Sequence, residues 1–204
     1  HGTSRPSYIH KSKKPYDIEE FETIQATELV DGKEQPFNNF SYFQVYPIKG
    51  KGFIALFTKY NKSGHRVIGF NTSKDGDHWN EWKILAHIQD GHYQVSAESN
   101  GKVGVAFDYH PKGKGLNYRT NLHYMETSDF GQTWKNIKGE IMQLPLTDSK
   151  NSAVVHDYAS EKLPNTGYKG HAVRGSALGY KTKVLLTAKK WAEAAATAKI
   201  IIDE

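Results

Sequence analysis

Three pairs of neighbouring side chains in the middle of the chain carry groups that could transfer protons and bind an anion. They combine two imidazoles, three phenols and one guanidinium: His92, Tyr93, Tyr109, His110, Tyr118 and Arg119. An imidazole titrates near neutral pH, and a guanidinium binds a carboxylate or sulfate through two parallel hydrogen bonds. The set would suit an acidic sugar. The structural alternative is that Tyr and His at strand ends only hydrogen-bond to loops.

An internal repeat indicates which elements must position these residues. The segment 42–46 (YFQVY) resembles the segment 92–96 (HYQVS) 50 residues later, and at the same offset the apolar run 53–57 falls on 103–107. Each unit reads as four short strands bounded by turn residues, at 41–48, 52–60, 66–73 and 79–86, and at 92–99, 102–109, 119–127 and 133–138. Four strands in about 50 residues are typical of a propeller blade.

We therefore expect an all-β fold, a β-propeller of four-stranded antiparallel blades that is incomplete in this chain. Full blades are expected near 41–86 and 92–138, the end of an earlier blade at 6–27, and the first strand of a later blade at 152–158. Because a closed propeller has about 4–8 blades, the chain is expected to be a fragment that is inactive alone.

Residues 1–163 are expected to form this partial propeller, and residues 164–204 an atypical tail that is either disordered or helical. The segment 189–201 is rich in Ala and Lys, which favours a helix. Our hypothesis for the change in pattern is a reading-frame error or a truncation near residue 163.

The strand order predicts where the six candidate residues meet. The first strand of a blade crosses from one propeller face to the other, the second returns, and the third and fourth repeat this movement. One face therefore carries the start of the first strand, the end of the second and the start of the third. We expect the six candidate residues to lie together on that face. The matching positions of the first blade are Tyr42, Tyr60, His65 and Arg66.

Two turns, expected on the opposite face, share a pattern of hydroxyl, carboxylate, glycine and tryptophan. They lie at 73–79 and 127–134, and the second fits Ser/Thr-x-Asp-x-Gly-x-Thr-Trp. A carboxylate can accept hydrogen bonds from turn amides, glycine allows a positive φ, and tryptophan buries a large area. We expect a structural role for Ser73, Asp75, Gly76, Trp79, Ser128, Asp129, Gly131 and Trp134.

These turns resemble the Asp box, or BNR repeat, of the sialidase-like propeller superfamily. Segments 11–18, 91–96, 106–111 and 117–122 are similar to segments of the BNR-repeat family that includes ulvan lyases, and the resemblance covers roughly residues 5–163. It implies a secreted or periplasmic bacterial protein that acts on a uronate-containing, sulfated polysaccharide by β-elimination.

Such a reaction needs a neutralised carboxylate, a base for the α-proton and an acid for the leaving oxygen. The resemblance implies His92, His110 and Tyr109 as catalytic residues, with Arg119, Tyr118 and Tyr93 binding substrate. The phenol could come from Tyr109 or Tyr118. The family takes a further catalytic Tyr and Arg from a blade after the second Asp box, where this sequence departs from the pattern.

Composition sets the expected partner. Lys and Arg number 27 against 22 Asp and Glu, which gives a formal net charge of +5. This balance favours an anionic poly- or oligosaccharide, although ordinary solubility would explain so modest an excess. No basic run indicates nucleic acid and no apolar run of 18 residues indicates a membrane. We expect a monomer when the protein is full length.

The sequence predicts no cofactor and no metal site. It contains no cysteine, and its ten histidines show neither His-x-x-x-His nor His-Glu-x-x-His spacing. A structural metal ion in the full-length protein is left open.

Two other functions stay open. A sialidase-type glycoside hydrolase also uses Asp boxes, but it needs three arginines on a carboxylate, and this chain has only Arg5, Arg66, Arg119 and Arg174. The third reading is a carbohydrate-binding propeller without catalysis.

Overall fold

The computed structural model describes residues 7–114, 118–158 and 191–203 of the chain, which divides into two compact units, His1–Glu161 and Lys162–Glu204. In the second unit it describes one helix, α2 (Trp191–Asp203), where the Thr197 hydroxyl donates to the carbonyl of Glu193. The rest of the predicted tail lies outside the described residues.

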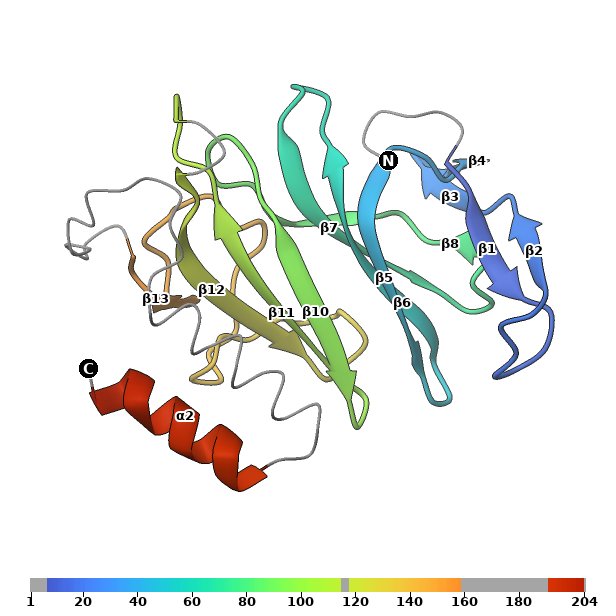
Figure 1. Ribbon diagram of the computed structural model, residues 1–204. Helices are drawn as coiled ribbons and strands as arrows, with labels where there is room; N and C mark the ends of the chain where they lie inside the picture. Colours follow the sequence, from blue (N-terminus) through green and yellow to red (C-terminus); the bar gives the residue numbers. More distant parts are fainter. Residues whose placement is uncertain (1–6, 115–117, 159–190, 204) are drawn as a thin grey trace. The chain divides into compact units, whose positions relative to one another are not determined.

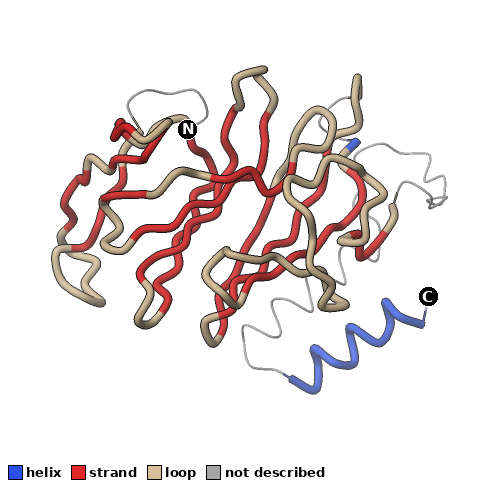
Figure 2. Tube along the Cα trace, turned by 180° about the vertical axis from the view of Figure 1, so that it is seen from behind, coloured by secondary structure: helices blue, strands red, loops and turns tan. Residues whose placement is uncertain are grey.

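The first unit is built from three β-sheets, seen from two sides in Figures 1 and 2. The first is the two-stranded ribbon β1 (Ile9–Ser12) and β2 (Phe21–Ile24). The second contains β3 (Thr27–Val30), β4 (Lys33–Pro36), β5 (Phe40–Ile48), β6 (Gly52–Tyr60), β7 (Arg66–Ser73), β8 (His78–Trp79) and β9 (Lys83–Ala86). The third contains β10 (Gln94–Ser99), β11 (Lys102–Tyr109), β12 (Thr120–Thr127) and β13 (Val154–His156). The all-β prediction is therefore confirmed, whereas these sheets are open and a propeller arrangement remains a prediction.

Burial patterns explain why the central strands form. Strand β6 is buried at six consecutive positions because both of its faces are covered: Ile54 and Leu56 belong to one apolar cluster, Ala55 and Phe57 to another. Strands β11 and β12 alternate buried and half-buried residues, which is the pattern of a sheet with one face packed on a core.

The larger apolar cluster joins the second and third sheets. Ile68 and Phe70 come from β7, and Val105 and Phe107 come from β11. The ring of Trp134 is buried against Phe70 at a centroid distance of 5.2 Å. Polar contacts tie the same two sheets, since Gln44 of β5 accepts hydrogen bonds from the amide and hydroxyl of Ser96 in β10.

The predicted fourth strands are wrong in detail. The stretch 79–86 is interrupted between β8 and β9, where the Asn71 amide donates to the carbonyl of Asn80. The stretch 133–138 contributes only a bridge at Lys135, because the buried Asn136 accepts hydrogen bonds from the amides of residues 138 and 140 and turns the chain.

Two flanking segments also differ from the prediction. Strand β13 does not begin a later blade but pairs with Leu122 and His123 of β12. It therefore shares with Lys135, which pairs with Glu126, the edge expected for 133–138. The β3–β4 hairpin was not predicted, and β3 pairs in parallel with β8, which extends the second sheet.

Candidate functional site

Side chains from the second and third sheets meet where several of their strands start or end. The members, which we call the Tyr–Arg cluster, are Tyr42, Tyr60, Arg66, Tyr93, His110 and Arg119. Arg66 is the first residue of β7, whereas Trp79 pairs with Ser73 at its last residue. The cluster and the turn at 73–79, which we call the first Asp turn, therefore lie at opposite ends of this strand, as the strand order predicts.

Tyr93 is the centre of the cluster. The His110 ring stacks on it at a centroid distance of 5.4 Å and an interplanar angle of 25°. The guanidinium carbon of Arg119 is 4.0 Å from the ring centroid, and Tyr42 contacts the ring edge-on at 5.2 Å. The Tyr93 amide donates to the Asp108 carboxylate at 3.3 Å, which fixes the backbone of this residue against β11.

Arg66 brings a second guanidinium to the same place. It donates to the Tyr60 hydroxyl at 2.8 Å, and its guanidinium carbon lies 5.8 Å from the Tyr42 centroid and 5.9 Å from the Tyr93 centroid. Desolvation and a hydrogen bond with Tyr93 raise the pKa of Tyr42, while Arg66 opposes this shift. The Tyr42 phenol therefore stays protonated at neutral pH.

His110 is the imidazole of the cluster that could exchange a proton. Its ring is 7% exposed, and its Nε2 has no hydrogen-bond partner among the residues that the structure describes. Burial lowers the pKa of His110, Arg119 and Arg66 act in the same direction, and Asp108 opposes them. The ring is therefore neutral at neutral pH and can accept a proton at Nε2.

A cavity of about 380 Å³ adjoins the cluster. Tyr93, Asp108 and Arg119 line it on the polar side, and Ala106 and Leu122 contribute apolar surface. Burial raises the pKa of Asp108, whereas the hydrogen bond from Tyr93 and the charge of Arg119 lower it. An apolar floor with a few convergent polar groups is the usual composition of a ligand site.

The structure does not support a proton-transfer role for His92. The ring is fully buried, its Nε2 accepts from the Ile88 amide at 2.8 Å, and its Nδ1 lies 2.7 Å from the Asp108 carbonyl oxygen. Since Nε2 accepts, Nδ1 must carry the proton and donate it. Burial lowers the pKa of His92 to about 3. Both nitrogens are occupied, so His92 holds the loop before Tyr93 in place.

Two of the predicted tyrosines also lie elsewhere. Tyr109 is 6% exposed and belongs to the larger apolar cluster, where it contacts His123 edge-on, so a catalytic role is not supported. Tyr118 is 58% exposed, and the Lys114 ammonium lies 5.7 Å from its ring. Among the described contacts, none joins Tyr118 to the Tyr–Arg cluster.

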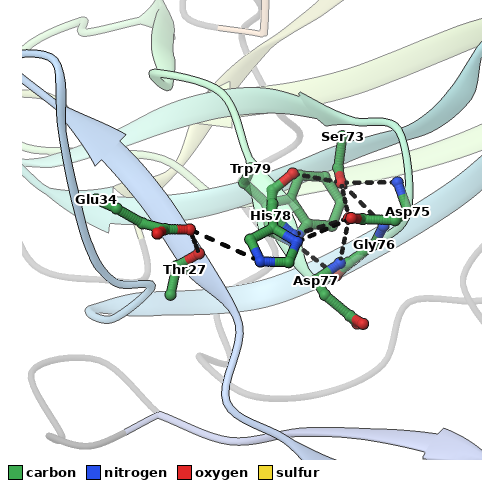
Figure 3. A network of polar contacts seen from close by, with 8 residues as sticks. All are labelled: Thr27, Glu34, Ser73, Asp75, Gly76, Asp77, His78 and Trp79. Atoms are coloured by element: carbon green, nitrogen blue, oxygen red, sulfur yellow. Dashed lines mark hydrogen bonds and ion pairs between the residues drawn. The ribbon is translucent and has the colours of Figure 1, made fainter.

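The first Asp turn has the expected local hydrogen bonds (Figure 3). Asp75 accepts from the amides of Asp77 and His78 and from the His78 ring, and these bonds lower its pKa. The Gly76 amide donates to the Ser73 hydroxyl, and the Trp79 indole donates to the Gly76 carbonyl.

The second turn repeats this arrangement with one correction. Asp129 accepts from the amide and hydroxyl of Thr133 and from the hydroxyl of Thr127, and the Gly131 amide also donates to Thr127. The hydroxyl therefore belongs to Thr127 and not to Ser128, which is exposed. Both turns are held by local bonds, which fits the structural role predicted for them.

Sequence reasoning left Tyr42, Tyr60, Arg66 and Asp108 out of the predicted site. The signal for the first three was present, because they occupy strand ends of the first unit that match the chosen positions of the second. No signal marked the close approach of the two sheets, which brings Arg66 to Tyr93.

Two kinds of feature are absent from the residues that the structure describes. No group of three or more His, Cys, Asp or Glu side chains is arranged to hold a metal ion. Helices of the length and apolar character needed to cross a membrane are also absent from the described ranges.

Comparison with known proteins shows similarity to an ulvan lyase. The chain is 31% identical over 147 residues to the ulvan lyase of Nonlabens ulvanivorans, which covers 67% of this chain and 30% of that protein. The chain thus spans about a third of the relative's length and is similar, at the level of sequence, to a polysaccharide lyase. No family model matches the sequence.

Two solved structures resemble the chain more distantly. Both are of an ulvan lyase described as a new family of polysaccharide lyase, one of them bound to a chain of glucuronate and 3-sulfated rhamnose. Each shares 20% identity and a TM-score of 0.48, over 67% of this chain and 33% of the other.

Proposed function

We propose that this chain is part of a carbohydrate-active protein that cleaves a uronate-containing, sulfated polysaccharide by β-elimination. The observation that carries the proposal is the contact of one phenol, Tyr93, with a neutral imidazole and a guanidinium at the edge of a cavity. Sequence similarity to an ulvan lyase supports the same reaction class.

The chemistry can be assigned to three side chains. Arg119 would hold the uronate carboxylate and neutralise its charge, which makes the neighbouring C–H bond more acidic. His110 would take this proton at Nε2, which has no partner among the described residues. The electron pair forms the new C=C bond as the glycosidic C–O bond breaks, and the Tyr93 hydroxyl would protonate the leaving oxygen.

The fold and location belong to the same proposal. The second and third sheets would be blades of a propeller with Asp-box turns of the BNR type, completed by further chain. The protein would be secreted or periplasmic and would act as a monomer. A sialidase is less well supported, because among the described residues only Arg66 and Arg119 are arginines, and that reaction needs three.

The test is a lyase assay on the protein completed by its further blades, paired with a binding measurement on this chain. The substrate is a sulfated glucuronate oligosaccharide. Elimination is followed by the ultraviolet absorbance of the new double bond, and binding affinity is measured by calorimetry. We expect His110→Gln and Tyr93→Phe to lower the elimination rate by roughly 10²–10⁴-fold, the usual contribution of an acid or base. The controls are His10→Gln and Tyr8→Phe, which alter an exposed imidazole and an exposed phenol outside the cluster.

The paired readouts separate the alternatives. Unchanged elimination in His110→Gln would contradict the assigned base. Binding that depends on Arg119, without double-bond formation under any condition, would favour a carbohydrate-binding module. Absence of both binding and elimination would reject the carbohydrate site.

A further inference from the structure

Two guanidinium groups from different sheets share one aromatic ring. The Arg66 carbon lies 5.9 Å from the Tyr93 centroid and the Arg119 carbon lies 4.0 Å from it, so the two cations are at most about 10 Å apart. Arg66 comes from the start of β7, whereas Arg119 precedes β12. Two like charges at this separation repel each other, and Asp108 supplies a nearby carboxylate for Arg119.

Among the described residues, the Arg66 guanidinium is surrounded by aromatic rings and not by a carboxylate. Its contacts are with the rings of Tyr42, Tyr60 and Tyr93 and with the Tyr60 hydroxyl. In the ranges 7–114, 118–158 and 191–203, no carboxylate lies within ion-pair distance of this half-buried guanidinium. A guanidinium has five N–H donors, so donors remain for a ligand.

The backbone of Tyr42 has a strained conformation, and its ring lies against both Arg66 and Tyr93. Tyr42 has φ of 53°, in the left-handed region that non-glycine residues rarely adopt. It lies in the register shift between Ser41 and Gln44 where β5 pairs with β6. Bulges re-aim side chains beside functional sites, and strain of this kind is concentrated at such sites. Here it places the Tyr42 ring against both Arg66 and Tyr93.

We propose that Arg66, together with Tyr42 and Tyr60, forms a second anion subsite that binds a sulfate group on the sugar next to the uronate held by Arg119. This inference rests on the proposed function, since it assigns two neighbouring negative groups of one substrate to two guanidiniums. Because Arg66 donates to the Tyr60 oxygen, the Tyr60 proton is directed elsewhere and can donate to a sulfate oxygen. Sulfate offers several strong acceptors, which suits convergent N–H and O–H donors.

The experiment compares two forms of one glucuronate oligosaccharide, sulfated and chemically desulfated. Calorimetry measures the affinity of the wild-type chain and of Arg66→Gln, Arg66→Lys, Arg119→Gln and Lys62→Gln for both forms. Lys62→Gln is the matched control, because it removes an exposed positive charge from the turn just before β7. Circular dichroism checks that each variant is folded.

The expected result is a sulfate-specific loss. Arg66→Gln should weaken binding of the sulfated form by about 10-fold or more, the range of a lost charge-assisted hydrogen bond, and leave the desulfated form nearly unchanged. Arg66→Lys should recover part of the loss, Arg119→Gln should weaken both forms, and Lys62→Gln should change neither. A purely structural Arg66 would instead weaken both forms equally.

Two results overturn the inference, and they differ in what they leave standing. If Arg66→Gln leaves both affinities unchanged, or lowers both by the same factor, while Arg119→Gln still weakens binding, the second subsite is rejected and the proposed function is retained. If the wild-type chain binds neither form, both the subsite and the proposed function are rejected.

Discussion

Protonation of His92 should be one of the main causes of acid unfolding in this protein. The folded state keeps the ring neutral, because it is fully buried and its two nitrogens are bonded to the Ile88 amide and the Asp108 carbonyl. The unfolded state can protonate the ring with an ordinary histidine pKa of about 6.5. Falling pH therefore favours the unfolded state.

The magnitude follows from the two pKa values. His92 has a folded-state pKa of about 3 against the ordinary value of 6.5. Between these values the unfolded chain binds one proton more than the folded chain, so stability falls by roughly 1.4 kcal/mol per pH unit. Over the whole interval the loss is on the order of 5 kcal/mol, which is comparable to the total stability of a small domain. Below about pH 3 the ring is protonated in both the folded and the unfolded state, so His92 causes no further loss of stability.

Urea unfolding of wild type and His92→Gln at several pH values between about 4 and 6 measures this effect. The variant should be less stable at pH 7 by about 2–3 kcal/mol, because it loses hydrogen bonds to buried partners. Its stability should nevertheless fall less steeply with pH, by up to about 1.4 kcal/mol per unit. His10→Gln is the control, since His10 is exposed and should leave the slope unchanged.

The comparison between variants is necessary because burial also lowers the pKa of His110 and His123, and both add to the slope in the same direction. Nitrogen NMR supplies a second readout: the His92 ring should be the Nδ1–H tautomer throughout this range. Equal pH slopes for wild type and His92→Gln, or an Nε2–H tautomer, would refute the reasoning.

Three further substitutions test the packing by thermal and urea unfolding at pH 7. Gly131→Ala should cost about 2–3 kcal/mol, because φ is 82° and a Cβ would lie 2.8 Å from the Phe70 ring; a variant as stable as wild type would contradict this. Asp129→Ala should cost about 1–3 kcal/mol through the lost turn hydrogen bonds, and no loss would show that the turn stands without its carboxylate. Lys59→Met should cost about 3–5 kcal/mol by leaving the buried Glu28 unpaired, with Lys59→Met/Glu28→Leu regaining much of it; an equally unstable double variant would rule out the charge as the cause.

Strands with strong local patterns were predictable from the sequence. The ranges 52–60, 66–73 and 102–109 agree with β6, β7 and β11, because each is a continuous or alternating apolar run between turn residues. The fourth strands failed for the opposite reason. Lys135 still pairs with Glu126 of β12, but Asn136 then turns the chain, and 154–156 pairs with the other end of that strand. This turn is a tertiary effect that no local pattern records.

The site was predictable in its position but only partly in its members. His92 and Tyr93 are neighbours, as are Tyr109 and His110, and successive side chains of an extended segment point to opposite sides. In the first pair the imidazole is fully buried and the phenol joins the cluster. This alternation was readable from the sequence. It would have placed only one residue of each pair on the ligand side, but it would not have shown which one.

Arg66 and Tyr42 reach the site for reasons that lie in the contact between the two sheets. The bonds from Ser96 to Gln44 set the approach of β10 to β5. At Gly91, where φ is 130°, a Cβ would lie only 3.2 Å from the Cβ of Arg66, so glycine allows the loop before Tyr93 to come this close. A cluster shared by two sheets keeps its geometry only while they stay docked. The apolar contacts between these sheets therefore position the guanidiniums as directly as the strands that carry them.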